Sequence, residues 1–310
     1  MSYRLSPLPG QPDFGVVVTG FKPEMIDDPN TRKALYDLWI DKGVLVFKEL
    51  AGLETHLKLS EVFGENQEHP LLRGLDLPRE KKVSITIDEV GGGVYEVHGE
   101  QLAGWLAWHK DSIYTDQLNH GGILWSIVVP ERGGQTGFID QIAAYDALPD
   151  DLKARVEGLN VIYAYSRDSW ESKFGEKPDR RIRLSDFQSK TMSHTTRSRV
   201  IHPMVYVQEQ TGRKVINVSP WFADGIEGME NPEGDALLRE VIAHITRPER
   251  AYFHQWVPGE MVLWDNWRLL HCATGTPVGM RREMRRTTIH GDYKLGRKER
   301  LEGAAQAGSL

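Results

Sequence analysis

The sequence predicts a mainly β protein with flanking helices, whose antiparallel strands form a jelly-roll core. Beyond residue 104, short apolar stretches far outnumber helical patterns, and turn signals such as residues 209–212 and 257–260 separate them. Strands and helices do not alternate there as they would in a parallel α/β sheet. The 310 residues contain no internal repeat, low-complexity tract or Pro/Ser-rich linker. We therefore expect one domain over residues 1–310.

The first third of the chain mixes helices with strands. Residues 31–41 show a helical pattern, with Ala34, Leu35, Leu38 and Trp39 on one side and Gly43 after the last turn. The other elements expected in this part are strands at 14–19, 44–47 and 83–87 and a helix at 53–63.

Strands dominate the remainder. They are expected at 105–113, 123–129, 137–140, 159–165, 203–207, 214–218, 252–256, 261–264 and 284–290, with helices at 151–157 and 235–246. Residues 88–104 and 167–199 show no clear period. Loops of such length are usually lids or disordered insertions, so these two segments are candidate lids.

Composition excludes several classes of protein. The chain has 38 Lys and Arg against 44 Asp and Glu, a net charge of −6, whereas nucleic-acid binders usually present a basic face. A single cysteine, Cys272, permits no internal disulfide framework. No apolar run reaches the ~18 residues that a membrane helix needs, and the first residues do not resemble a signal peptide. We expect a cytoplasmic protein with neither nucleic acid nor membrane as a partner.

Two histidines and a carboxylate form a candidate metal site. His109 and Asp111 are two residues apart in an expected strand, where side chains at this spacing share a face. His271 follows an apolar strand near the other end of the chain and can supply a third ligand. Such a triad is typical of non-haem Fe(II) sites, in which three coordination positions stay open.

Other pairs of candidate ligands have the same spacing as His109 and Asp111. His98 lies between Glu96 and Glu100 and offers similar pairs, but it follows three glycines, where a rigid ligand set is not expected. A histidine taken alone is also commonly a hydrogen-bonded structural residue.

A second constellation lies on the last expected strand. Arg282, Met284 and Arg286 share one face, so two guanidinium groups can enter one cavity. The planar fork of arginine binds a carboxylate or sulfonate through two parallel hydrogen bonds. The alternative is a solvated edge strand protected by charge.

Several motifs occur in an order that resembles a known family. They are Trp108-His109-Lys110-Asp111, Gly133-Gly134-Gln135-Thr136, Ala143-Ala144-Tyr145-Asp146-Ala147-Leu148-Pro149, His202-Pro203 and Trp264-Asp265-Asn266, followed by His271. With these motifs the chain resembles the Fe(II)- and 2-oxoglutarate-dependent dioxygenases typified by taurine dioxygenase and dichlorophenoxyacetate dioxygenase. The resemblance spans about residues 14–286, nearly the whole chain.

The resemblance implies a double-stranded β-helix, the cupin-like form of the jelly roll. It makes His109, Asp111 and His271 the ligands of Fe(II). Thr136 and Arg282, which stands eleven residues after His271, would hold the distal carboxylate of 2-oxoglutarate. O2 is the other co-substrate, and dimers or tetramers are common in the family.

The resemblance also implies substrate-binding residues. Arg286 matches an arginine that holds the anionic end of the substrate, and His69 and Phe222 match a substrate-binding histidine and a pocket aromatic. A loop histidine and a core phenylalanine are the alternative interpretations of those two residues. Trp105 stands where the taurine enzyme has an asparagine, which suggests a larger, less polar substrate.

Together these features predict a dioxygenase that hydroxylates a C–H bond of a small anionic substrate, a carboxylate or sulfonate with an apolar or aromatic portion. 2-Oxoglutarate is decarboxylated to succinate and CO2 in the same reaction. Two alternatives are a jelly-roll hydrolase or isomerase that uses the triad with another metal, and a catalytically silent binding module of the same fold.

Overall fold

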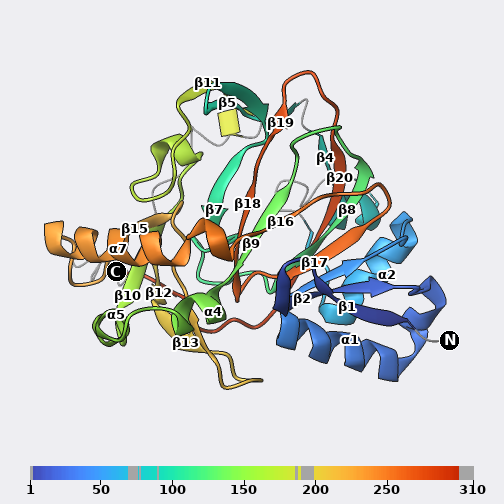
Figure 1. Cartoon of the computed structure of the whole chain (residues 1–310), viewed down its shortest axis with the longest axis horizontal. Helices are drawn as coiled ribbons and strands as arrows, with labels where there is room; N and C mark the ends of the chain where they lie inside the picture. The colour runs from blue at the N-terminus through green and yellow to red at the C-terminus, as the bar shows by residue number, and fades with distance from the viewer. Residues whose placement is uncertain are drawn as a thin grey trace, which may run out of the picture.

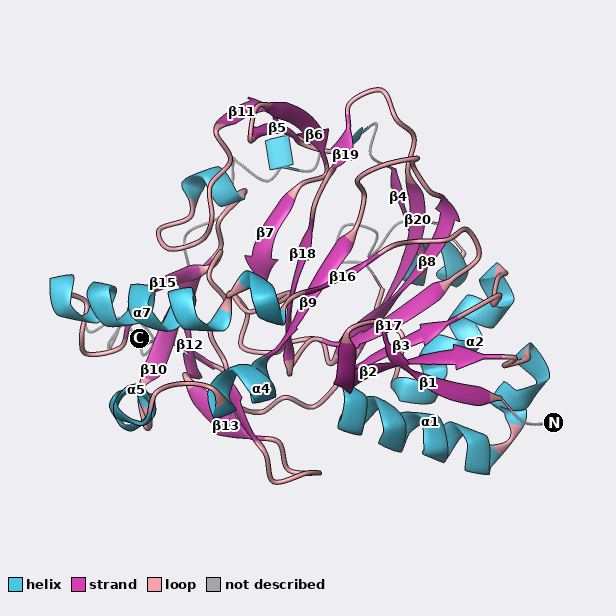
Figure 2. Ribbon diagram, in the orientation of Figure 1, coloured by secondary structure: helices cyan, strands magenta, loops and turns pink. Residues whose placement is uncertain are grey.

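The computed structural model describes residues 3–68, 76, 78–88, 91–185, 188–189 and 199–299. The strands of this part form five sheets (Figure 1, Figure 2). The large sheet has the order β1 (Arg4–Leu8), β2 (Gln11–Thr19), β3 (Val44–Phe47), β17 (Met261–Asp265), β8 (Gly121–Val128), β20 (Glu283–Ile289) and β4 (Ile85–Asp88). The four-stranded sheet beside it, here called the ligand sheet, has the order β16 (Tyr252–His254), β9 (Thr136–Asp140), β18 (Leu269–Ala273) and β7 (Leu106–His109).

The chain passes repeatedly between these two sheets. β7 lies in the ligand sheet, β8 in the large sheet, β9 and β16 in the ligand sheet, β17 in the large sheet, β18 in the ligand sheet and β20 in the large sheet. All pairings among these strands are antiparallel. Apolar side chains from both sheets form a common core, among them Val46, Trp264 and Met284 from the large sheet and Phe138 and Leu269 from the ligand sheet.

Helices cover the other face of the large sheet. α1 (Pro29–Lys42) and α2 (Leu53–Phe63) pack against its strands, with η1 (Pro23–Asp27) preceding them (Figure 2). Because both faces are covered, every residue of β3 is buried, and the strand is apolar throughout instead of alternating. Asp28 caps α1 by accepting hydrogen bonds from the backbone N–H groups of Asn30 and Thr31.

A second core joins the remaining helices to a sheet of order β15 (Ala223–Ile226), β10 (Asn160–Ala164), β12 (Arg199–Pro203) and β21 (Arg297–Lys298). Its helices are α4 (Gln141–Asp146), α5 (Asp150–Val156) and α7 (Pro232–Ile245), and α7 contributes the apolar stripe Leu237, Leu238, Val241 and Ile245. The short elements nearby are the hairpin β13 (Val205–Val207) and β14 (Lys214–Ile216) and the 3-10 helix η6 (Pro248–Arg250).

Both segments expected to be lids contain regular structure. β5 (Val94–Val97) and β6 (Glu100–Ala103) form a hairpin in the first, while η4 (Ser169–Glu171) and β11 (Arg180–Arg183) lie in the second. β11 pairs with β5, and β6 pairs with β19 (Thr276–Pro277). Tyr95 of β5 also donates a hydrogen bond to the buried Asp168 at 3.5 Å. The two segments therefore contact each other.

Most of the expected elements are confirmed, some with shifted ends. The helices at 31–41, 53–63, 151–157 and 235–246 correspond to α1, α2, α5 and α7. On α1, however, Ala34 is exposed, and the buried side chains are Leu35, Trp39 and Ile40. The strand expected at 203–207 is divided between β12 and β13, and α3 (Arg79–Val83) occupies the start of the strand expected at 83–87. No helix of the described ranges is long and apolar enough to cross a membrane.

Candidate metal centre

Cross-strand pairing brings the two histidines together. His109 is the last residue of β7, and His271 lies at the centre of β18, directly opposite it in the antiparallel pair. The centroids of their imidazole rings are 4.2 Å apart. Residues directly opposite each other on one face of a sheet are the closest neighbours that pairing can produce. Two histidines far apart in sequence therefore become adjacent.

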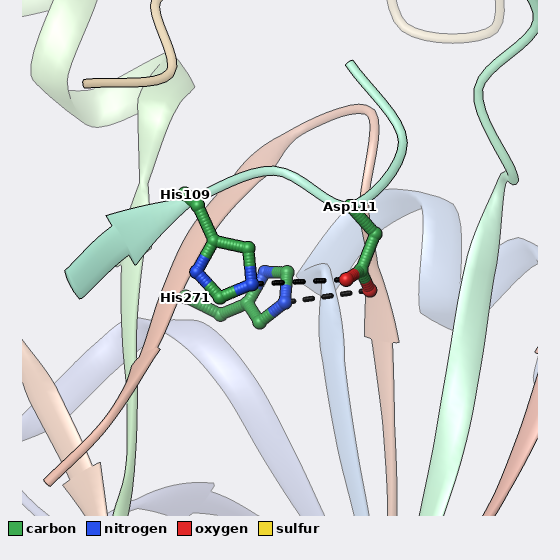
Figure 3. A group of neighbouring side chains, drawn as sticks. All are labelled: His109, Asp111 and His271. Atoms are coloured by element: carbon green, nitrogen blue, oxygen red, sulfur yellow. Dashed lines mark ion pairs between the residues drawn. The ribbon is translucent and has the colours of Figure 1, made fainter. Parts of the chain in front are cut away.

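Asp111 approaches the same point from a turn. The expectation that it shares a strand with His109 is wrong, because β7 ends at His109 and Asp111 begins the turn that follows. Its Oδ1 lies 3.7 Å from His109 Nε2, and its Oδ2 lies 3.4 Å from His271 Nε2 (Figure 3). One donor atom from each residue lies within 4.8 Å of the others. Donors about 2.1 Å from an ion and at right angles would be about 3 Å apart, so the three residues fit one metal ion with little movement.

The two imidazoles present the nitrogen that a metal needs. His109 Nδ1 donates to the carbonyl of Ala107 at 2.7 Å, which leaves the lone pair of Nε2 directed at Asp111. His271 is buried, and its Nδ1 has no hydrogen-bond partner among the described residues. Burial lowers the pKa of His271 to about 4, and the neighbouring His109 adds to this effect. His271 is therefore neutral at pH 7, which is the form that binds metals.

Asp111 is held as a carboxylate. Burial alone would raise its pKa, but the guanidinium of Arg286 and the two histidines keep the pKa well below its usual value. Arg286 Nη2 donates to Asp111 Oδ2 at 2.5 Å, and its guanidinium also lies 5.2 Å from the centre of the Trp264 ring. The arginine expected to bind a substrate anion thus lies directly beside the three candidate ligands.

Two buried side chains that the sequence analysis did not assign hold this turn in place. Asn266 Oδ1 accepts from the N–H of Asp111 at 2.8 Å, and its Nδ2 donates to the carbonyl of Asp111 at 3.0 Å. Lys110 points the other way and donates to Asn217 Oδ1 at 2.9 Å and to the carbonyl of Trp267 at 2.5 Å. Burial lowers the pKa of Lys110 to about 7, although Asp265 opposes the shift. Asn266 belongs to a noted motif, whereas no sequence signal separates Lys110 from a surface lysine.

Thr136 and Arg282 lie at the same turn. Thr136 begins β9 and is paired with Ala273 of β18, two residues beyond His271. Arg282 is buried and packs over the backbone of Gly134, where an added methyl group would lie 2.9 Å from Arg282 Cδ. Gly134 has φ of +68°, a conformation that glycine adopts without strain. The two residues expected to bind 2-oxoglutarate are thus assembled around one glycine turn next to β18.

Aromatic side chains border the histidines. The rings of Trp221 and Phe222 lie 5.1 and 6.2 Å from that of His109, and the Tyr114 ring lies 4.9 Å from that of Phe222. Trp105 is buried just before β7 and contacts Tyr95 of β5 at 6.1 Å.

His69, which the sequence predicts to bind the substrate, lies outside the residues that the structure describes.

Residues 4–288 match the family described as Taurine catabolism dioxygenase TauD, TfdA family. A similar curated protein is the (S)-phenoxypropionate/alpha-ketoglutarate-dioxygenase of Sphingobium herbicidovorans, which is 33% identical over 286 residues, 90% of this chain and 92% of the relative. An alpha-ketoglutarate-dependent 2,4-dichlorophenoxyacetate dioxygenase of a Burkholderia species is 34% identical over 221 residues, 70% of this chain and 68% of the relative.

Solved structures share the fold. A putative alpha-ketoglutarate-dependent taurine dioxygenase from Burkholderia xenovorans aligns with a TM-score of 0.73 at 21% identity, covering 97% of this chain and 99% of that one. AAD-2, solved in complex with Mn(II) and N-oxalylglycine, aligns with a TM-score of 0.71 at 24% identity, covering 95% and 100% of the two chains. With a family match over nearly its whole length and a relative that is 33% identical over 90% of it, this chain belongs to the TauD, TfdA family of dioxygenases.

Proposed function

We propose that this protein is an Fe(II)- and 2-oxoglutarate-dependent dioxygenase that hydroxylates a C–H bond of a small anionic organic substrate. 2-Oxoglutarate is decarboxylated to succinate and CO2 in the same turnover. The observation that carries the proposal is the convergence of His109, Asp111 and His271 within 4.8 Å, in a chain that belongs to a dioxygenase family. That membership supports this function over a metal hydrolase or isomerase and over a silent binding module.

The triad would hold Fe(II) through two neutral imidazoles and one carboxylate. This donor set occupies one side of the ion and leaves three positions for exogenous ligands. When bound, the iron supplies the site at which 2-oxoglutarate and O2 are brought together and activated. Asn266 and Lys110 anchor the turn that carries Asp111, so the carboxylate is directed at the histidines before the metal binds.

Thr136 and Arg282 would hold the distal carboxylate of 2-oxoglutarate. A buried arginine offers a planar pair of donors that matches a carboxylate, and the hydroxyl of Thr136 adds one more. Thr136 is paired with Ala273 of β18, the strand that carries His271, and Arg282 packs against Gly134, two residues before Thr136. A co-substrate bound at this turn would therefore lie beside the metal site.

The substrate would bind between Arg286 and the aromatic residues. In the structure, Arg286 balances the charge of Asp111. A cation bound to Asp111 would take over that role, and the guanidinium would then be available to a carboxylate or sulfonate. The aromatic rings of Phe222 and Trp105 would contact the apolar portion. The names of the relatives, which act on phenoxypropionate and 2,4-dichlorophenoxyacetate, support a substrate that joins an acid to an aryl group.

The same proposal extends to architecture. Seven strands are shared between the ligand sheet and the large sheet, and the chain passes repeatedly from one sheet to the other, which supports a double-stranded β-helix core within a single domain. Residues 88–104 and 167–199 would act together as its lids, since their strands pair with each other.

The test is an anaerobic optical titration of the metal-free protein with Fe(II) and then 2-oxoglutarate. A visible charge-transfer band that requires both additions is expected, and His109→Ala and Asp111→Ala should abolish it. Glu100→Ala serves as the matched control, because Glu100 flanks the alternative ligand His98 on a different sheet, and this variant should keep the band. Absence of the band in the unmodified protein would refute the proposed function. A band lost only in Glu100→Ala would move the site to His98.

A further inference from the structure

We propose that Trp256 is a positioning residue for 2-oxoglutarate. Its indole N–H holds the Thr136 hydroxyl in the rotation that directs the hydroxyl hydrogen at the distal carboxylate of the co-substrate. The inference rests on the proposed function, because it requires Thr136 to bind that carboxylate.

The hydrogen bond between the two residues has only one possible direction. Trp256 is buried, and its Nε1 donates to Thr136 Oγ1 at 3.2 Å. An indole N–H is a donor only, whereas a hydroxyl has one hydrogen and two acceptor positions. Trp256 therefore fills an acceptor position and cannot take the hydrogen. In the part of the chain that the structure describes, it is the only hydrogen-bond partner of this hydroxyl, so the hydrogen remains available to an incoming carboxylate.

The indole itself is fixed by the strand that pairs with Thr136. In β16, His254 lies directly opposite Thr136 of β9, and Trp256 follows two residues later. The His254 ring meets the Trp256 ring edge to face, with centroids 4.6 Å apart. His254 Nε2 donates to the buried Glu260 at 3.0 Å, and Tyr252 donates to His254 Nδ1 at 2.9 Å. These two hydrogen bonds fix the orientation of the His254 ring, which packs against the indole of Trp256.

Glu260 also anchors the backbone beside Trp256. Its Oε2 accepts from the N–H of Val257 at 3.1 Å, and its Oε1 forms an ion pair with Lys48. A tryptophan that packs against the His254 ring and is anchored at the next peptide group has little freedom to rotate. The Thr136 hydroxyl is thus oriented before the co-substrate arrives, and less free energy is lost in ordering it on binding.

The test is Trp256→Phe, which keeps a ring and removes the N–H. The dissociation constant of 2-oxoglutarate is measured by calorimetry on the Mn(II)-loaded protein. We expect it to rise about five- to tenfold, less than the loss of a complete hydrogen bond to a charged group. Affinity for Mn(II) should stay unchanged, and in turnover assays KM for 2-oxoglutarate should change more than kcat. Trp125→Phe, on the large sheet, is the matched control and should leave all of these unchanged.

2-Oxopentanoate is the second probe, because it has the same carbon chain without the distal carboxylate. Trp256→Phe should not change its affinity. An equal loss of affinity for both oxo acids would overturn the inference, since the effect would then not act through the carboxylate. Unchanged Mn(II) affinity in the same sample shows that the variant is folded, so an equal loss of both oxo acids from the Mn(II)-loaded protein counts against the inference.

Thr136→Val separates failure of the inference from failure of the proposed function. If Thr136→Val leaves the affinity for 2-oxoglutarate unchanged, the assignment of the co-substrate site is wrong. If Thr136→Val weakens binding and Trp256→Phe does not, only the inference is overturned. In the Thr136→Val background, Trp256→Phe should have no further effect, because the group it orients is gone. Additive losses would show that Trp256 acts by another route and would overturn the inference.

Discussion

Replacing Arg268 with leucine is expected to destabilise the fold by about 3–5 kcal/mol, because it leaves a carboxylate buried without its cation. The Arg268 side chain is 1% exposed, and its Nε and Nη2 donate to the two carboxylate oxygens of Asp140 at 2.7 and 2.8 Å. Asp140 also accepts the N–H of Ile142 at the start of α4 and is paired with Leu269 of β18. The ion pair thus ties the first turn of α4 to the strand that carries His271.

Most of the stability lost in Arg268→Leu should arise from the unpaired carboxylate of Asp140. Arg268 Nη1 also donates to the carbonyls of Ile40 and Asp41 at the end of α1, at 3.2 and 2.7 Å. The same two carbonyls accept from Arg213 at 3.3 Å, so their loss is partly compensated. The buried Asp140 carboxylate would then keep, among the described residues, only the backbone N–H of Ile142 as a donor. A buried ion pair that has lost one partner is the costly case.

Urea denaturation followed by circular dichroism measures the loss. Arg281→Leu is the control, because Arg281 is exposed and its pair with Glu283 at 2.6 Å should contribute less than about 1 kcal/mol. The double variant Arg268→Leu/Asp140→Leu should lose less than the sum of the two single variants, since no unpaired charge then remains buried. A loss below about 1 kcal/mol for Arg268→Leu, or additive losses, would refute the reasoning.

Three further outcomes are expected. Burial lowers the pKa of His56 to about 4, so on acidification His56 becomes protonated in the unfolded chain before it does in the folded protein. The free energy of unfolding should therefore fall between about pH 6.5 and pH 4, by up to about 3 kcal/mol from this group. Urea titrations at pH 7 and pH 4.5 should show a smaller fall in His56→Gln, and an equal fall would contradict the assignment. Gly134→Ala should weaken the binding of 2-oxoglutarate to the Mn(II)-loaded protein, measured by calorimetry, without changing the affinity for Mn(II). The reason is that the new methyl group would strain the backbone at φ of +68° and displace Arg282. Unchanged affinity for 2-oxoglutarate would show that Arg282 does not bind from this position. Arg282→Ala should weaken the same binding by about 2–5 kcal/mol if it forms one side of a buried charge pair, and unchanged affinity would remove it from the co-substrate site.

The local sequence pattern predicted the elements whose apolar residues recur with a clear period or form a continuous run. The strand expected at 44–47 and the helix expected at 53–63 have the observed ends, since Gly43, Gly52 and Gly64 interrupt the chain beside them. Some of the elements that were missed are short strands that depend on distant partners. β11 has four residues and pairs with β5 across about 80 residues of chain, so no local period marks it. β18 was missed for the same reason, although it carries His271.

The candidate metal ligands show what the sequence could predict and what depends on tertiary structure. Residue chemistry and motif order were enough to select His109, Asp111 and His271, because few side chains bind a metal and the motifs occur in a family order. Their convergence depends on the antiparallel register of β7 and β18 and on the turn that begins after β7 ends at His109.

The supporting contacts were decided by the tertiary structure alone. Nothing in the local sequence indicates which groups Lys110, Asn266 and Trp256 contact. Their partners, Asn217, Asp111 and Thr136, lie more than 100 residues away along the chain. A hydrogen bond needs two groups within about 3 Å, and for distant groups only the packing of the sheets sets that separation. Sequence therefore determined which chemistry this protein carries, and packing determined which side chains hold that chemistry in place.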